Sequence, residues 1–135
     1  MDLTEYLNHR DAMQTGDAII FAGEGLVSSL IKRVTKSPFS HVAMIAKWKP
    51  YQVERVYLCQ ATVEFGVHMV PASRYLAQHR GSAWWVKLRT EGLPPDYQPR
   101  LLDAASQDFG RGYDRQGIGQ FLIPKWFKQQ DANRF

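Results

Sequence analysis

The amino-acid sequence predicts an α+β fold, in which an antiparallel sheet of about five or six strands is flanked by helices. Two features of the sequence lead to this prediction. Apolar segments of strand length recur along the chain and are separated by turns rich in glycine, proline or charged residues. Between them lie segments whose apolar residues recur at the spacing of one helical face.

The N-terminal part of the chain is predicted to form a helix, a strand and a second helix. Residues 3–13 favour a helix that begins after Asp2, a residue type that often caps helices. The segment GDAIIFAG is a short apolar run bounded by glycines and predicts a buried strand over residues 18–21. An apolar stripe indicates the second helix, which should end before Pro38; its residues are Leu26, Val27, Leu30, Ile31 and Val34.

The remaining chain supplies the other strands. Residues 39–48 and 53–62 are expected to pair as an antiparallel hairpin around the turn WKPYQ. Further strands are predicted over residues 66–71 and 82–89, and further helices over residues 72–78 and 99–109, the last closed by Gly110. The final segment, GIGQFLIPKWFKQQDANRF, is aromatic and interrupted by glycines and a proline.

Length and composition fit a single domain spanning residues 1–135. The net charge of +4 arises from scattered charges without a block of five or more of one sign, so a nucleic-acid partner is not expected. The single cysteine, Cys59, excludes an intrachain disulfide and a multi-cysteine zinc site, and the histidines lack metal-ligand spacing. We therefore expect no metal and no cofactor.

The N-terminal segment MDLTEYLNHRDAMQTGDAII carries charges throughout and lacks the apolar centre of a signal peptide. No apolar run approaches the roughly 20 residues of a membrane-spanning helix. A cytoplasmic protein, or a component of a virus particle, is therefore expected.

His41 and Gln60 are the candidate catalytic residues. His41 shares a strand face with Ala43 and Ile45, and Gln60 shares a face with Leu58 on the next strand. If the register places both on one face, Gln60 can accept a hydrogen bond from one ring nitrogen of His41 and leave the other nitrogen as a base. From the residues alone, a structural histidine and a solvated glutamine remain the alternative.

Several motifs, in order, resemble the NlpC-type branch of the papain-like cysteine peptidases and amidases. They are TGDAIIFAG, SHVAMIA and CQATVEFGVHMVP, in which the matching residues are Gly16, Asp17, Ser40, His41, Val42, Gln60, Ala61, Gly66 and Val67. Most members have their cysteine before Gly-Asp, and no cysteine precedes Gly16 here. The chain therefore looks more like the circularly permuted group, which includes the lecithin:retinol acyltransferase-like enzymes. In that group the histidine comes first and the cysteine opens a helix near the C-terminus, and GRGYD followed by GIGQFL resembles the approach to that helix.

The resemblance implies a papain-like fold, with His41 as base and Gln60 as the residue that orients it. It also implies a cysteine after Tyr113 and Asp114, but none follows as far as Phe135. Either the domain is truncated and the cysteine lies beyond residue 135, or the nucleophile has been lost. In both cases the His41 face of the sheet would lack the helix that covers it in the family, and an open groove is expected there.

Three other residues are interpreted as structural. Cys59 should point away from the His41 face, because side chains alternate along a strand, and it should behave as an inert buried residue rather than as a replacement nucleophile. Asp17 is interpreted as a hydrogen-bond acceptor in a turn, and Glu64 as a solvated loop residue.

Two function classes remain open. The first is a hydrolase of the cysteine peptidase or amidase type, which acts on an amide or ester bond in a peptidoglycan peptide, another peptide or a lipid. The second is an inactive papain-like module with a structural or binding role, for example in a phage particle or an envelope-associated assembly. In the second class the aromatic segment 121–127 would contact a protein partner, unless it simply packs on the sheet.

Overall fold

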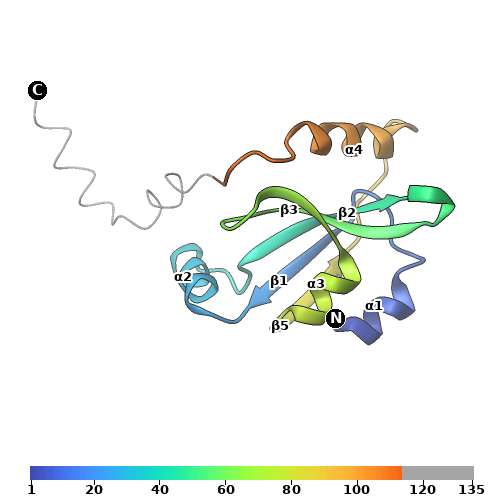
Figure 1. Cartoon of the computed structure of the whole chain (residues 1–135). Helices are drawn as coiled ribbons and strands as arrows, with labels where there is room; N and C mark the ends of the chain where they lie inside the picture. Colours follow the sequence, from blue (N-terminus) through green and yellow to red (C-terminus); the bar gives the residue numbers. More distant parts are fainter. Residues whose placement is uncertain (114–135) are drawn as a thin grey trace, which may run out of the picture.

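The computed structural model describes residues 1–113 and confirms the α+β class (Figure 1). Five strands form one antiparallel sheet in the order β4-β3-β2-β1-β5. The strands are β1 (Ala18–Gly23), β2 (His41–Trp48), β3 (Arg55–Thr62), β4 (Gly66–Pro71) and β5 (Gly81–Val86). The helices are α1 (Leu3–His9), α2 (Leu26–Thr35), α3 (Ala72–Gln78) and α4 (Tyr97–Gln107), with a short 3₁₀ helix, η1 (Pro50–Gln52), between β2 and β3. The predictions for the aromatic segment 121–127 lie outside the described residues.

The hydrophobic core lies between one face of the sheet and the helices α1 and α3 (Figure 1). Alternate residues of β1 and β2 point into it, because side chains on a strand alternate between the two faces. The buried residues on the sheet side include Ile19, Phe21, Ala43, Ile45 and Leu58, and those on the other side are Tyr6, Met13, Ala72 and Leu76.

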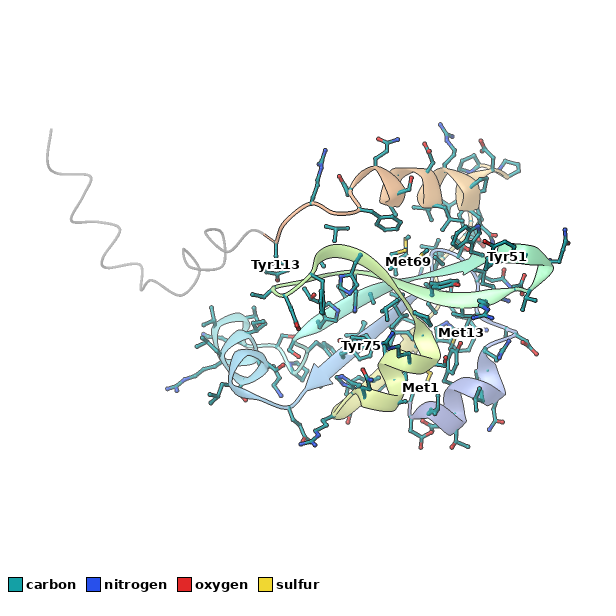
Figure 2. The ribbon with its side chains drawn as sticks, viewed as in Figure 1. Met1, Met13, Tyr51, Met69, Tyr75 and Tyr113 are labelled. Atoms are coloured by element: carbon teal, nitrogen blue, oxygen red, sulfur yellow. The ribbon has the colours of Figure 1, made fainter. Side chains whose placement is uncertain are left out.

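The opposite face of the sheet is covered only in part, by α4. Figure 2 shows Met69 on the side of the sheet that faces α4 and Met13 on the side of α1. Val42, which points to the α4 side, is 58% exposed. Apolar cavities of about 370 and 350 Å³ lie beside α4 on this face. None of the helices in residues 1–113 has both the length and the apolar character needed to cross a membrane.

α1 begins as predicted but is shorter than the expected helix over residues 3–13. The Asp2 carboxylate accepts a hydrogen bond from the Glu5 backbone N–H, and the Glu5 carboxylate accepts one from Asp2 N–H, both at 2.9 Å. This reciprocal pair is a capping box. The helix ends at His9, and the turn that follows carries Met13 into the core.

Two boundaries near the C-terminal side differ from the prediction because backbone N–H groups find other partners. β5 ends at Val86, since the N–H of Leu88 donates to the Asp17 carboxylate rather than to a neighbouring strand. The last helix extends over Tyr97–Gln107, and its C-cap is Asp108 rather than Gly110. Gly110 instead donates its N–H to the carbonyl of Val67 at 2.9 Å, with a φ of 83° that favours glycine.

Candidate functional site

His41 and Gln60 lie on one face of adjacent antiparallel strands. The register pairs Met44 with Cys59, so the next position along places Gln60 opposite Ala43, diagonal to His41. Nε2 of His41 is 2.7 Å from Oε1 of Gln60. The predicted juxtaposition of His41 and Gln60 is therefore confirmed, and their catalytic roles stay a prediction.

Gln60 is also bonded to His68 on the following strand. β3 and β4 pair so that Gln60 lies directly opposite His68, and Nε2 of Gln60 is 3.2 Å from Nε2 of His68. The second ring nitrogen of His68, Nδ1, is 2.9 Å from the carbonyl oxygen of Gly66. Side chains from three adjacent strands thus form one hydrogen-bonded row, the His–Gln–His row, which comprises His41, Gln60 and His68.

The carbonyl of Gly66 determines the direction of each hydrogen bond in the row. A carbonyl oxygen only accepts, so Nδ1 of His68 donates to it. In a neutral ring, Nε2 of His68 then accepts from the Gln60 amide N–H, which turns the Gln60 oxygen toward His41. His41 donates from Nε2, and its Nδ1 carries the lone pair. The row therefore presents Nδ1 of His41 as a base.

Burial favours the neutral form of His41. Desolvation lowers the pKa of His41 below its ordinary value; the hydrogen bond to Gln60 acts in the opposite direction, and the charge of a protonated His68 lowers the pKa further. Gln60 is itself only 5% exposed, so water does not readily replace its hydrogen bonds. The neutral imidazole is the form that can accept a proton from a nucleophile.

A cavity of about 380 Å³ opens beside His41. Two aromatic rings pack near the imidazole, Phe21 with ring centroids 5.7 Å apart and Tyr75 at 6.3 Å. His79 stacks on Tyr75, and burial lowers the pKa of His79, whose Nε2 is buried without a hydrogen-bond partner among residues 1–113. Polar groups line much of the remaining wall, including Glu24, Ser28, Ser40, Gln78 and Arg80.

The open groove expected on the His41 face is present at one end of that face only. Phe21, Ile45 and Leu58 lie on this face and are fully buried beneath α1 and α3. The apolar side chains of the His41 face form the core, because burying them is the main stabilising contribution available to the sheet. The face opens at the end that carries the His–Gln–His row, into the cavity beside His41 and into a second cavity of about 460 Å³ lined by Gln60 and His68.

Cys59 lies on the opposite face, as predicted. It is paired with Met44 and lines a cavity under α4 together with Ala105 and Phe109. Burial raises the pKa of the Cys59 thiol, which makes the reactive thiolate scarce at neutral pH. These observations agree with the interpretation of Cys59 as an unreactive core residue.

Asp17 is a structural acceptor, as expected from the sequence. It is 4% exposed. Its Oδ2 accepts from the Gln14 N–H at 3.0 Å and from the Trp85 indole N–H at 2.9 Å, and its Oδ1 accepts from the Leu88 N–H at 2.9 Å. Glu64 lies exposed in the turn between β3 and β4, in line with its interpretation as a solvated loop residue.

His68 is the residue of the site that the sequence reasoning missed. The spacing of the histidines in the sequence gives His68 no partner for binding a metal ion. The signal was nevertheless present: residues 63–65 form a short turn, Thr62 pairs with Gly66, and counting outward from that pair places Gln60 opposite His68. Among residues 1–113, no three His, Cys, Asp or Glu side chains gather into a group that could hold a metal ion.

Fold and site together define a small α+β domain in which the His–Gln–His row crosses the sheet beside a polar cavity, with a defined donor and acceptor in each of its hydrogen bonds. No protein-family model matches the chain, and no curated protein matches it significantly. Among solved structures, the chain is similar to the crystal structure of metalloprotein yiiX from Escherichia coli O157:H7, DUF1105. The TM-score is 0.61 and the sequence identity 25%, over 75% of this chain and 53% of that one. This chain therefore spans about half the length of the yiiX structure.

Proposed function

We propose that the chain is a cysteine-hydrolase-type domain of the permuted papain-like kind, which acts on amide or ester bonds with His41 as base and Gln60 as its orienting residue. The observation that carries this proposal is the direction of the His–Gln–His row. It supplies a neutral imidazole with a defined tautomer and a lone pair on Nδ1, beside a cavity. A thiol nucleophile requires such a base. The motifs that resemble the NlpC-type group support the same function.

In the proposed reaction, Nδ1 of His41 takes the proton of a cysteine thiol, and the thiolate attacks the carbonyl carbon of the substrate. The imidazolium then gives this proton to the leaving amine or alcohol, and a thioester remains. Water then loses a proton to the same nitrogen and attacks the thioester, the carboxylic acid leaves, and the imidazolium returns the proton to the cysteine sulfur. An acceptor amine or alcohol in place of water makes the reaction a transfer. Gln60 holds the ring throughout by accepting from Nε2–H.

The thiol has to come from chain beyond residue 135, because Cys59 is the only cysteine up to that point and faces the other side of the sheet. The path of the backbone after α4 supports the proposal that a following segment brings the thiol to the His–Gln–His row. Val67 N–H donates to the Arg111 carbonyl and Gly110 N–H donates to the Val67 carbonyl, both at 2.9 Å. The chain after α4 is thereby tied to the strand that carries His68. Figure 2 shows Tyr113, the last described residue, at the same end of the sheet as the β3–β4 turn.

The lining of the cavity favours a peptide-like substrate. The carboxylate of Glu24, the guanidinium of Arg80 and the hydroxyls of Ser28 and Ser40 offer partners for charged and amide groups. A lipid acyl chain would use few of these partners, whereas peptidoglycan peptides and other peptides would use several. The yiiX structure is described as a metalloprotein, but residues 1–113 here gather no group of three donors, so no step of the proposal involves a metal.

The test compares the chain of residues 1–135 with the same chain carrying its encoded continuation through the next cysteine. We expect the extended protein to hydrolyse a fluorogenic peptide amide or ester, and its new cysteine to be labelled by a peptidyl vinyl sulfone. The chain of residues 1–135 should do neither. His41→Ala should abolish turnover in the extended protein, and Cys59→Ser should preserve it. Unchanged turnover in His41→Ala, or His41-dependent labelling of Cys59, would contradict the proposal.

The position of Cys59 favours a second candidate, an inactive papain-like module that binds a partner in a phage particle or an envelope-associated assembly. The only thiol of residues 1–135 lies where His41 cannot reach it. The partly covered face beneath α4 would then be the contact surface. A stop codon directly after Phe135, together with no turnover, would select this function over the first.

A further inference from the structure

The His–Gln–His row links the protonation state of one histidine to the tautomer of the other. His41 and His68 each bond a different end of the Gln60 side-chain amide. An amide has one accepting end and one donating end. When Nε2 of His68 accepts, Nε2 of His41 has to donate, and when Nε2 of His68 donates, Nε2 of His41 has to accept. The two histidines are therefore coupled through a side chain that can rotate.

We propose that His68 is a positioning residue that controls the base through Gln60. Neutral His68 holds His41 in the tautomer with a free Nδ1. Protonation of His68 turns its Nε2 into a donor, so the Gln60 amide rotates by half a turn and offers its N–H₂ to His41. The proton of His41 then resides on Nδ1, and the base is switched off.

The backbone around His68 allows this exchange without movement of the ring. Nδ1 of His68 carries a proton in both states, so its hydrogen bond to the Gly66 carbonyl persists while only Nε2 changes role. Gly66 has a φ of 64°, and the next residue, Val67, donates its N–H to the Arg111 carbonyl at 2.9 Å. The Gly66 carbonyl therefore keeps its hydrogen-bonded place in both states, and the amide of Gln60 is the part that turns.

Other ionisable groups lie around the two histidines but, among residues 1–113, make no hydrogen bond to the row. Glu64, Arg74 and Tyr75 line the cavity around His68, and Glu24 and His79 line the cavity beside His41. His79 lies close enough to interact electrostatically with His41, since the charge of His41 contributes to lowering the pKa of His79. Within residues 1–113, the side-chain partners of Gln60 are His41 and His68. His79 is therefore a suitable control for effects of charge alone.

The tautomers can be read directly by long-range ¹H–¹⁵N NMR on the chain of residues 1–135, labelled at its histidine nitrogens and titrated with acid. Near neutral pH, His68 should carry its proton on Nδ1 and His41 on Nε2. As His68 takes up its second proton, the His41 ring should change to the Nδ1–H form before it becomes protonated itself. A His41 ring that keeps Nε2–H throughout the titration of His68 would overturn the proposal.

Three variants separate the relay from a simple charge effect. His68→Phe should abolish the tautomer change, and so should Gln60→Glu, because a carboxylate accepts at both ends and leaves His41 with Nε2–H. His79→Phe removes a titrating ring beside His41 without touching the row, and the change should persist. Persistence in Gln60→Glu, or loss in His79→Phe, would show a through-space effect and overturn the proposal. If His68→Phe does not fold, the titration of the unmodified chain and Gln60→Glu still decide.

Only the consequence for catalysis rests on the proposed function. In the extended, active protein, loss of kcat/KM in acid should follow the titration of His68 seen by NMR. His68→Phe should lower kcat/KM near neutral pH roughly three- to tenfold, which corresponds to the free energy of one hydrogen bond. It should also remove the loss of kcat/KM in acid. A tautomer change without any turnover would refute the hydrolase function and leave this inference standing. Turnover whose pH dependence is the same in His68→Phe would overturn the inference and leave the function standing.

Discussion

Replacement of Asp17 by asparagine tests how the start of β1 is joined to the chain after β5. The Asp17 carboxylate accepts three hydrogen bonds, from Gln14 N–H, Trp85 Nε1–H and Leu88 N–H. Asparagine has a single accepting atom. In the better orientation of the asparagine side chain, its oxygen takes the position of Oδ2 and keeps the hydrogen bonds from Gln14 and Trp85. The asparagine N–H₂ then faces the backbone N–H of Leu88, and these two donors are left unpaired.

The size of the effect follows from these bonds. A hydrogen bond to a charged acceptor contributes about 1.5–3 kcal/mol, and the two bonds that remain weaken because the acceptor becomes neutral. We therefore expect Asp17→Asn to lower the free energy of unfolding by about 2–4 kcal/mol. Asp17→Ala, which loses all three bonds, should cost more, about 4–5 kcal/mol.

Urea unfolding of the chain of residues 1–135, followed by far-ultraviolet circular dichroism, measures both values. Asp11→Asn is the matched control, because the Asp11 side chain is 99% exposed and its ion pair with Arg10, at 3.5 Å, lies on the surface. Its effect should stay within about 0.5 kcal/mol. A loss for Asp17→Asn no larger than that of the control would refute the reasoning.

Three further predictions concern single residues near the site. Gly66→Ala should lower the melting temperature far more than Gly92→Ala. Both glycines have a positive φ, but only at Gly66 would the new Cβ collide with a backbone atom, the carbonyl oxygen of Arg111. Equal losses would contradict this. Cys59→Ser should lower the free energy of unfolding by about 1–3 kcal/mol, because it buries a hydroxyl. The native Cys59 thiol should react slowly with a disulfide reagent, and fast labelling of the folded protein would show that burial does not control the reactivity of this thiol. Burial lowers the pKa of His41 in the folded protein below its value of about 6.5 in the unfolded chain, so the unfolded chain binds more protons as the pH falls below about 6.5. The free energy of unfolding should therefore decrease as the pH drops through this region. His41→Phe should flatten this pH dependence, and a steeper dependence would contradict the assignment.

Elements that depend on local pattern could be predicted from the sequence. The helix predicted over residues 72–78 coincides with α3 (Ala72–Gln78), and the hairpin of β2 and β3 is present with His41 and Gln60 on one face. Period-two alternation and the position of turns are sufficient for both, because neighbouring strands in an antiparallel hairpin inherit their register from the turn.

Features that depend on distant contacts could not be predicted. Both faces of β1 and β2 carry apolar residues, with Ile19 and Ile45 on one side and Ile20 and Met44 on the other. Alternation alone therefore does not tell which face the helices cover, and for this reason the groove expected on the His41 face is confined to one end of it. The end of β5 depends likewise on the Asp17 carboxylate, a partner far away in the sequence.

The pairing of β1 with β5 has a consequence for the order in which the domain folds. Strands β1 to β4 each lie beside the next in sequence, but the second edge of β1 is closed only when Ala18 pairs with Val86 and Phe21 with Ala83. During synthesis, β1 therefore emerges long before its last partner and presents an open row of backbone donors and acceptors in the meantime. Closure by β5 is the long-range step that should limit the folding rate. Chains released before Val86 keep that edge exposed, and they should associate through it rather than fold.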